Sequence, residues 1–270
     1  VIYYICKMLA ILLEVLDMNH TLLKSVIYDQ HEFIRNFQIV PRNYEFEENG
    51  NYVLVGLRRA GKSTLLYKIV LDLVASGVDW DQIIYINFED ERLSEFTVAD
   101  FNDILSVQSE LSDKKGYFFL DEVQNIDGWE KFARRMADSK EHIYITGSNA
   151  RMLSREIETT LGGRFFAKHI TPYTFGEYLT ACEIPHNEQA MLGTKTNGKI
   201  RAACAQYLQY GGLPESLLYK AKREYISGVY QKVLLGDIIT RNKIRNDYAV
   251  KILVKKIAES VRNEISYSKL

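Results

Sequence analysis

The strongest structural signal in this sequence is the stretch Tyr52-Val-Leu-Val-Gly-Leu-Arg-Arg-Ala-Gly-Lys-Ser-Thr64. Its first four residues are apolar and predict a buried strand. Residues 56–63 then fit the pattern G-x-x-x-x-G-K-S/T, and a helical pattern runs from Lys62 to Ala75. A glycine-rich loop between a strand and a helix is typical of a site that binds phosphate groups. The alternative is a glycine turn that only caps the helix.

Each residue type in this loop suits one part of a nucleotide. Glycines at both ends let the backbone curl so that its N–H groups point inward at phosphate oxygens. We expect Lys62 to reach the β- and γ-phosphates, the Ser63 hydroxyl to bind Mg²⁺, and Thr64 to extend the cap of the helix. The residues predicted to hold the nucleotide are Gly56, Leu57, Arg58, Arg59, Ala60, Gly61, Lys62, Ser63 and Thr64.

A pair of acids ends another apolar run, Tyr117-Phe-Phe-Leu-Asp-Glu122. Asp121 falls at the carboxyl end of a predicted strand, where open α/β sheets bind their ligands, so we expect it to hold Mg²⁺. Glu122 would then project toward the γ-phosphate and orient the attacking water as a catalytic residue. The alternative is that Asp121 caps the next segment and that Glu122 is a solvated charge.

A third polar element follows the next predicted strand, where Thr146, Ser148 and Asn149 could each sense the γ-phosphate. Of these three residues we predict Ser148 as the catalytic one. Ordinary capping of a helix over residues 150–158 explains at least one of them without a catalytic role.

Short apolar runs alternate with helical patterns along residues 51–170, which is typical of parallel strands joined by crossover helices. Most of these runs are continuous rather than alternating, as expected for strands that helices cover on both faces. The sequence therefore predicts an α/β fold with a buried parallel sheet. The five predicted strands are Tyr52–Val55, Ile83–Phe88, Tyr117–Leu120, His142–Thr146 and Phe165–Ile170.

Helical patterns replace the strands after Ile170. The capping box Thr174-Phe-Gly-Glu177 predicts a helix that runs through Cys182. A turn at Tyr210-Gly-Gly-Leu-Pro214 separates two of the later helices. We interpret these helices as a small domain. The further helices are predicted over Lys199–Tyr210, Pro214–Leu235 and Tyr248–Val261.

The composition is that of an ordinary globular protein. Of 270 residues, 47% are hydrophobic and 26% are charged, which argues against disordered, collagen-like and multi-span membrane classes. The 34 Lys and Arg residues nearly balance the 35 Asp and Glu residues, so a nucleic-acid contact must come from a local basic patch. Three distant cysteines support neither a disulfide framework nor a zinc site, and a reducing cytoplasm fits best.

The apolar stretch from Val1 to Leu16 is interrupted by Lys7 and Glu14 and is too short to span a bilayer. It also lacks the basic start and the small-residue cleavage site of a signal peptide. We expect no membrane partner. We interpret residues 1–17 as a non-native or mis-started extension ahead of a start at Met18.

Five segments together resemble the bacterial and archaeal P-loop ATPases of the AAA superfamily that carry a C-terminal domain of unknown function. The resemblance implies a parallel sheet of strand order 5-1-4-3-2, with the phosphate loop as Walker A and the acid pair as Walker B. It also implies an ATPase core over residues 18–171, a helical lid over 172–235, and the start of a truncated winged-helix domain over 236–270. The segments are residues 56–64, Phe119-Leu-Asp-Glu-Val-Gln124, Ile145-Thr-Gly-Ser148, Leu161-Gly-Gly-Arg164 and Tyr210-Gly-Gly-Leu-Pro214.

The same resemblance implies roles for two further residues. Arg164 lies where AAA relatives place a catalytic arginine finger, which stabilises transition-state charge on the nucleotide of a neighbouring subunit and so requires a homo-oligomer. A structural surface arginine is the open alternative. Asn87 lies where relatives hold an Asn that restrains the catalytic Glu until a partner binds.

The C-terminal stretch is locally basic, which is compatible with phosphate contacts on DNA. Lysines on an amphipathic helix usually form a solvated face, so the two interpretations stay open. The cations concerned are Arg241, Lys243, Arg245, Lys251, Lys255, Lys256 and Arg262.

The sequence favours ATP over GTP, because Asn242-Lys-Ile-Arg245 lacks the acid that pairs with guanine in the motif Asn/Thr-Lys-x-Asp. Our main hypothesis is therefore a cytoplasmic, Mg²⁺-dependent ATPase whose turnover repositions the helical lid. The alternative is a nucleotide-gated switch or DNA-binding adaptor that binds ATP and hydrolyses almost none of it. Both hypotheses use the same site, and the sequence leaves the choice open.

Overall fold

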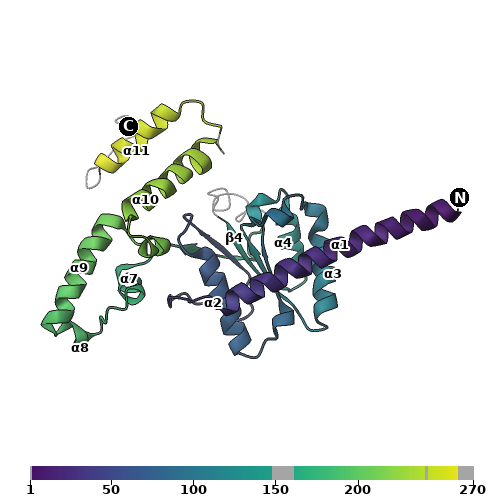
Figure 1. Cartoon of the computed structure of the whole chain (residues 1–270), viewed down its shortest axis with the longest axis horizontal. Coiled ribbons are helices and arrows are strands. Elements are labelled where there is room, and N and C mark those ends of the chain that lie inside the picture. The colour runs from purple at the N-terminus through teal and green to yellow at the C-terminus, as the bar shows by residue number, and fades with distance from the viewer. Residues whose placement is uncertain (1, 148–160, 241–242, 261–270) are drawn as a thin grey trace. The chain divides into compact units, whose positions relative to one another are not determined.

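A computed structural model describes residues 2–147, 161–240 and 243–260 of the chain (Figure 1). The chain divides into two compact units, which are treated separately below. Unit 1 comprises Val1–Tyr207 with Gly211–Pro214, and unit 2 comprises Leu208–Tyr210 with Glu215–Leu270. In the described part of the chain, no helix is both long and apolar enough to cross a membrane.

Unit 1 is built on a five-stranded sheet of order β2-β3-β4-β1-β5, in which every pairing is parallel. This order confirms the predicted 5-1-4-3-2 arrangement of a P-loop fold. Each predicted strand is present, with its ends within one residue of the expected position. The strands are β1 (Tyr52–Gly56), β2 (Ile83–Asn87), β3 (Tyr117–Asp121), β4 (His142–Gly147) and β5 (Phe166–Ile170).

Helices cover both faces of this sheet, as the continuous apolar runs predict (Figure 1). One face packs against α1 (Ile2–Arg35), α3 (Phe101–Leu111) and α4 (Trp129–Asp138). The other face packs against α2 (Lys62–Ala75), which follows β1 directly as expected. The edge strand β5 departs from the prediction, because most of its residues are exposed or half-buried.

Under α2, a ladder of aromatic rings crosses four neighbouring strands. Tyr85 stacks on Phe119 with ring centroids 6.0 Å apart, Phe119 stacks on Tyr144 at 4.8 Å, and Tyr144 stacks on Tyr52 at 5.9 Å. Such cross-strand aromatic pairs stabilise a sheet beyond the area they bury. The ladder fixes the register that brings the carboxyl ends of the strands to one edge.

Residues 2–17 form the first half of α1, and Figure 1 shows this part of the helix projecting beyond the sheet of unit 1. No secondary structure was predicted for these residues from the sequence. Their interpretation as a non-native extension stays a prediction, as do the predicted domain boundaries.

In the described residues ahead of β4, four short 3-10 segments lie in the connections of unit 1. They are η1 (Trp80–Gln82), η2 (Glu91–Leu93), η3 (Val98–Asp100) and η4 (Val123–Asn125). The next helices after β5 are α7 (Phe175–Ala181), α8 (Glu188–Met191) and α9 (Thr194–Tyr210). The capping box of α7 is confirmed, since Thr174 and Glu177 satisfy each other's backbone N–H groups.

Unit 2 contains η5 (Pro214–Leu218), α10 (Lys222–Gln231), the π-helical segment η6 (Lys232–Thr240) and α11 (Asp247–Glu259). The expectation of one helix over Pro214–Leu235 is therefore wrong. Contacts across the break explain the difference: Tyr219 stacks on Tyr225, and the Tyr225 hydroxyl donates to Glu215. A side chain ahead of the break is thus tied to α10 in a way that helical periodicity does not encode.

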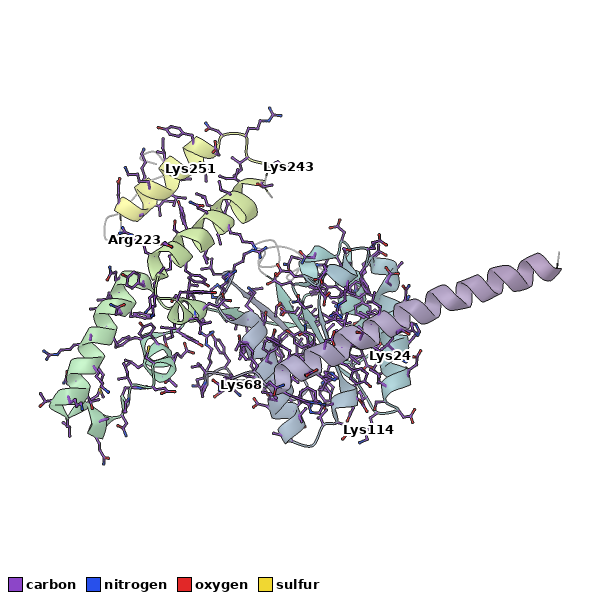
Figure 2. All side chains as sticks on the ribbon, viewed as in Figure 1. Lys24, Lys68, Lys114, Arg223, Lys243 and Lys251 are labelled. Carbon is purple, nitrogen blue, oxygen red and sulfur yellow. The ribbon has the colours of Figure 1, made fainter. Side chains whose placement is uncertain are left out.

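Unit 2 also concentrates positive charge, because its sequence has twice as many Lys and Arg residues as Asp and Glu residues. Figure 2 shows Arg223 on α10, Lys243 on the segment ahead of α11, and Lys251 on α11. No residue of α11 is buried. Arg241 and Arg262 lie outside the described residues.

Candidate functional site

The phosphate loop leaves β1 and enters α2 with two residues in the left-handed backbone region, Arg59 (φ 61°) and Gly61 (φ 93°). Glycine is needed at Gly56 for another reason: a Cβ there would lie 2.1 Å from the carbonyl oxygen of Ile170 in β5. Gly61 occupies the N-cap of α2 and supplies no side chain to cap it. The backbone N–H groups of the first turn are therefore available to an anion, as the sequence predicts.

Lys62 places its ammonium group inside this loop. The residue is only 4% exposed, and Nζ donates to the carbonyl oxygens of Gly56 and Leu57 at 3.3 Å each. Its Nζ also lies 3.8 Å from Glu122 Oε1. Burial lowers the pKa of Lys62, and the nearby Glu122 and Asp121 carboxylates oppose that shift.

Asp121 is held at the end of β3 by hydroxyl groups from two other strands. The carboxylate is 1% exposed and accepts hydrogen bonds from Tyr85 of β2 at 2.7 Å and from Thr146 of β4. Burial raises the pKa of the Asp121 carboxyl, and the hydrogen bonds from Thr146 and Tyr85 act in the opposite direction. The Ser63 hydroxyl also acts to lower this pKa, so the two predicted magnesium ligands, Ser63 and Asp121, are neighbours.

Glu122 adopts a left-handed backbone conformation (φ 52°), which is uncommon for a residue other than glycine. Its backbone N–H donates to the Thr146 hydroxyl at 2.9 Å, and its Oε2 accepts a hydrogen bond from Gln124. These contacts hold the carboxylate on the side of Lys62. Strained residues of this kind persist where surrounding contacts determine them, and they cluster at active sites.

Thr146 is the polar residue that the structure brings to the centre of the site, since its hydroxyl bonds both Asp121 and Glu122. The sequence singled out Thr146 as one of three options but favoured Ser148. Ser148 and Asn149 lie outside the described residues, so the prediction for Ser148 stays a prediction. Asn87 pairs in register with Asp121, and its Oδ1 accepts a hydrogen bond from the Glu89 N–H.

Arg164 lies away from the phosphate loop of its own chain. It precedes β5, whose first residue pairs with the first residue of β1, at the edge of the sheet opposite the loop. The guanidinium forms an ion pair with Asp138 at 2.5 Å and is about one-third exposed. This position does not support a role for Arg164 at the phosphate loop of its own chain. Its role at the nucleotide of a neighbouring subunit stays a prediction.

Two contacts of the site could not be predicted from the sequence. In the sequence, Tyr85 resembles any other aromatic residue of a buried strand, but its hydroxyl donates a hydrogen bond to Asp121. The turn at residues 210–214 is visible in the sequence, but its position is not. Gly212 accepts a hydrogen bond from the Tyr173 N–H at 2.8 Å, and Pro214 Cγ lies 3.7 Å from where a Cβ of Gly61 would be.

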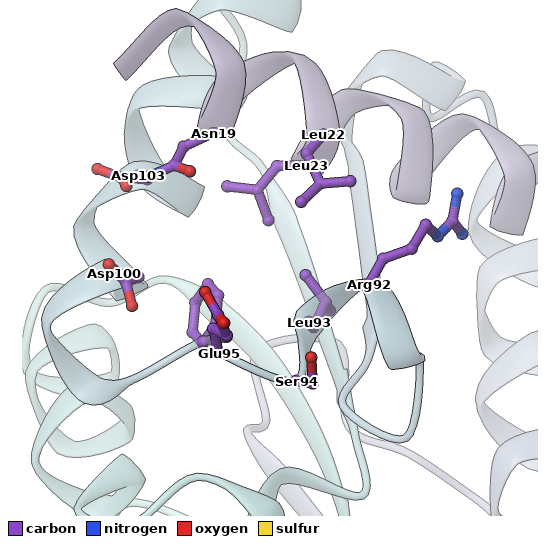
Figure 3. A pocket seen from close by; sticks show the side chains of 10 residues that line it. Asn19, Leu22, Leu23, Arg92, Leu93, Ser94, Glu95, Asp100 and Asp103 are labelled. Carbon is purple, nitrogen blue, oxygen red and sulfur yellow. The ribbon is translucent and has the colours of Figure 1, made fainter. Parts of the chain in front are cut away.

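A second concave region of unit 1 lies between α1 and the segment from η2 to α3, as Figure 3 shows. Leu22 and Leu23 of α1 face Leu93, and Asp100 and Asp103 line its other end. This pocket of about 300 Å³ contains no residue of the phosphate loop or of the acid pair. It is therefore separate from the candidate site.

Known proteins with similar sequences support the interpretation of unit 1. Residues 48–179 match the family model of the AAA domain. An uncharacterized protein of Methanocaldococcus jannaschii is 32% identical over 92% of this chain and 56% of its own length. An uncharacterized protein of Haemophilus influenzae is 32% identical over 81% of this chain and 53% of its own length. The chain thus spans little more than half the length of these relatives.

One similar solved structure is that of the Aeropyrum pernix ORC1 protein in complex with DNA. It matches 77% of this chain and 60% of its own, with 16% sequence identity and a TM-score of 0.38.

Proposed function

We propose that this chain, in which residues 48–179 form an AAA domain of the P-loop ATPase type, binds ATP with Mg²⁺ and hydrolyses its β–γ phosphoanhydride bond. The observation that carries the proposal is the meeting of Lys62 and Glu122 at the mouth of the phosphate loop, with Nζ 3.8 Å from Oε1. A cation for the phosphates and a carboxylate for the attacking water are the two groups that such a reaction requires. ATP is favoured over GTP, because Arg245 stands where a guanine-binding motif has its acid.

The donor set fits Mg²⁺, which prefers hard oxygen ligands and usually keeps water and substrate phosphates in its coordination shell. Ser63 and Asp121 supply one hydroxyl and one carboxylate, and the two side chains are neighbours. When bound, Mg²⁺ neutralises charge on the β- and γ-phosphates. The hydrogen bonds from Tyr85 and Thr146 fix the orientation of the Asp121 carboxylate for this purpose.

The protein's own residues divide the remaining work. Lys62 exchanges its two loop carbonyl partners for phosphate oxygens, which stabilises the charge that develops on the transferred group. Glu122 accepts a hydrogen bond from the attacking water and orients it in line with the scissile bond. The bond from Gln124 to Glu122 holds that carboxylate in place until the water is present.

Coupling of the nucleotide state to the rest of the chain would pass through the turn at residues 210–214. Pro214 lies beside Gly61 of the phosphate loop, and unit 2 begins again at Glu215. A loop that changes shape on binding or releasing phosphate would therefore act on Pro214, the last residue of unit 1 ahead of Glu215. We include movement of the helical lid in the proposal on this basis.

DNA binding by unit 2 is a second candidate activity, and the excess of positive charge in that unit favours it. Lys243 and Arg245 form no ion pair with any described acid, whereas Lys251 and Lys255 are each paired with an acid on α11. Steady-state ATPase activity with and without duplex DNA, at two salt concentrations, tests this candidate. DNA contact predicts stimulation or inhibition that weakens at high salt.

Release of phosphate from ATP by the wild-type chain and by Lys62→Ala, each with Mg²⁺ and with excess EDTA, tests the proposed reaction. We expect turnover by the wild type with Mg²⁺ only. Tight ATP binding without turnover under all conditions would favour the nucleotide-gated switch instead. Binding equal to wild type in Lys62→Ala would contradict use of this loop.

A further inference from the structure

We propose that Arg42 is a positioning residue for the phosphate loop: it fixes the loop backbone from outside and ties that backbone to Glu177 at the start of α7. Arg42 lies in the connection between α1 and β1, where the sequence has no nucleotide-binding motif. The inference rests on the proposed function, because it concerns the affinity of the same loop for nucleotide.

Three donors of the Arg42 guanidinium reach three different segments of unit 1. Nε donates to Glu177 Oε1 at 2.9 Å, and one terminal nitrogen donates to the carbonyl oxygen of Ala60 in the phosphate loop at 2.9 Å. The other terminal nitrogen donates to the carbonyl oxygen of Thr171, just after β5, at 2.8 Å. One planar cation thus joins the loop, the end of β5 and the first turn of α7.

The surroundings of Arg42 require a guanidinium rather than any cation. Its side chain is only 3% exposed, and the cation lies over the rings of Tyr44 and Tyr173 at 5.1 and 5.3 Å from their centroids. A lysine in the same place would be a single point donor and could not reach all three acceptors at once. The planar, rigid fork is therefore the feature that the contacts use.

The bond to Ala60 determines where the next N–H of the loop points. In a trans peptide, the carbonyl group and the following N–H point to opposite sides. Because Arg42 draws the Ala60 carbonyl to its side, the N–H of Gly61 is turned away from Arg42. Arg42 thereby organises the loop before nucleotide arrives, and this reduces the ordering cost of binding.

The partner Glu177 is itself fixed. Its carboxylate accepts the backbone N–H of Thr174 at 2.8 Å in the capping box of α7. Burial alone would raise the pKa of Glu177, but the hydrogen bonds from Arg42 and Thr174 outweigh that effect and lower it. Next to this box, Tyr173 contacts the turn that carries Pro214 to the loop. Arg42 therefore links the phosphate loop to the segment that holds this turn.

Binding and catalysis by Arg42→Lys, Arg42→Met and Glu177→Gln test the inference, with Mg²⁺–ADP and Mg²⁺–ATP as ligands. We expect both Arg42 variants to raise the Kd for ADP and the KM for ATP about tenfold, which is the effect of losing one charge-assisted hydrogen bond. We expect kcat at saturating ATP to stay within about twofold, since Arg42 contacts no reacting group. Glu177→Gln should raise the same Kd by a smaller factor.

Hydrogen exchange without nucleotide gives a readout that does not depend on ATP. Amides of residues 56–64 and 171–177 should exchange faster together in Arg42→Met than in wild type. The matched control is Arg92→Met, because Arg92 bridges Asp29 and Asp90 away from the loop. That control should leave the Kd and the exchange of both segments unchanged.

The outcomes separate this inference from the proposed function. If the wild type binds ATP but Arg42→Met and Arg42→Lys bind as tightly as wild type, the positioning role is wrong and the proposed function stands. Recovery of wild-type Kd by Arg42→Lys would likewise contradict it, because only charge would then matter. If the wild type binds no nucleotide, both fail. Should Arg42→Met not fold, Arg42→Lys and Glu177→Gln decide the question.

Discussion

The hydroxyl of Tyr85 donates a 2.7 Å hydrogen bond to the buried carboxylate of Asp121, one strand away in the sheet. The ring of Tyr85 also begins the aromatic ladder under α2, so one residue joins the core to the candidate magnesium ligand. A buried carboxylate that loses such a donor keeps its desolvation cost without the compensating bond.

Replacement of Tyr85 by Phe should therefore lower the free energy of unfolding by about 2 kcal/mol, as expected for a hydrogen bond to a buried charged group. Urea denaturation measures this change. Tyr144→Phe is the matched control, because Tyr144 belongs to the same ladder but does not donate a hydrogen bond to Asp121. Equal losses in the two variants would show that the ring environment, and not the bond to Asp121, sets the cost.

Gly212 should tolerate no side chain. A Cβ there would lie 2.2 Å from the carbonyl oxygen of Tyr173, so Gly212→Ala must displace the turn from Tyr173. We expect a loss of about 2 kcal/mol in the free energy of unfolding, together with weaker ATP binding, because Pro214 moves with the turn. Gly228→Ala in α10 is the control: nothing lies within 4 Å of its Cβ, and alanine should stabilise a helix interior by roughly 0.5–1 kcal/mol. An unchanged free energy of unfolding in Gly212→Ala would contradict the close approach of Gly212 to the Tyr173 carbonyl.

The proposed role of Arg164 at a neighbouring subunit requires association of the chain. Turnover per chain should then rise with protein concentration for wild type and stay low at all concentrations for Arg164→Ala. Arg134→Ala is the appropriate control, since Arg134 pairs with the same Asp138 as Arg164 does. If both variants lose activity equally, the ion pair to Asp138 explains the effect and the arginine finger is excluded. Specific activity that is independent of concentration would also count against it.

Stability should depend on the protonation of Glu177 in acid. Its pKa is lowered in the folded chain from a usual value of 4.5, so the unfolded chain binds the proton first as the pH falls. The contribution of Glu177 is therefore fully present above about pH 4.5 and is lost as the pH falls through the lower folded pKa. The stability difference between wild type and Glu177→Gln should shrink in that window. A difference that stays constant from pH 7 to about pH 3 would contradict the role of the ionised carboxylate.

Much of this architecture follows from local sequence patterns, for identifiable reasons. Strands β1 to β4 of unit 1 are almost fully buried apolar runs, and the glycines at Gly56 and Gly61 meet backbone requirements that few other residues can meet. The break after Leu218 and the position of the 210–214 turn depend on contacts between distant residues, such as Tyr173 with Gly212. The role of Arg42 could not be predicted from the sequence either, because a single arginine in an irregular segment belongs to no periodic pattern and no motif.

Within the candidate site, the two acidic residues could be predicted from the sequence, but the hydroxyl groups that hold them in place could not. Asp121 and Glu122 follow an apolar run, so their place at the carboxyl edge of the sheet could be predicted. The hydroxyls of Tyr85 and Thr146 that hold them come from neighbouring strands, and only the parallel register brings them together. Sequence spacing contains no information about that register.

The most direct test of the proposed hydrolysis compares wild type with Glu122→Gln, measuring ATP turnover and ATP affinity on the same preparations with Mg²⁺. Glutamine keeps the size of the side chain and removes the charge that orients the water. We predict that Glu122→Gln loses at least about a hundredfold in kcat, the usual contribution of a positioned general base, while its Kd for ATP stays within about threefold. Turnover by Glu122→Gln at the wild-type rate would contradict the assignment of Glu122 and, with it, the mechanism proposed for this site.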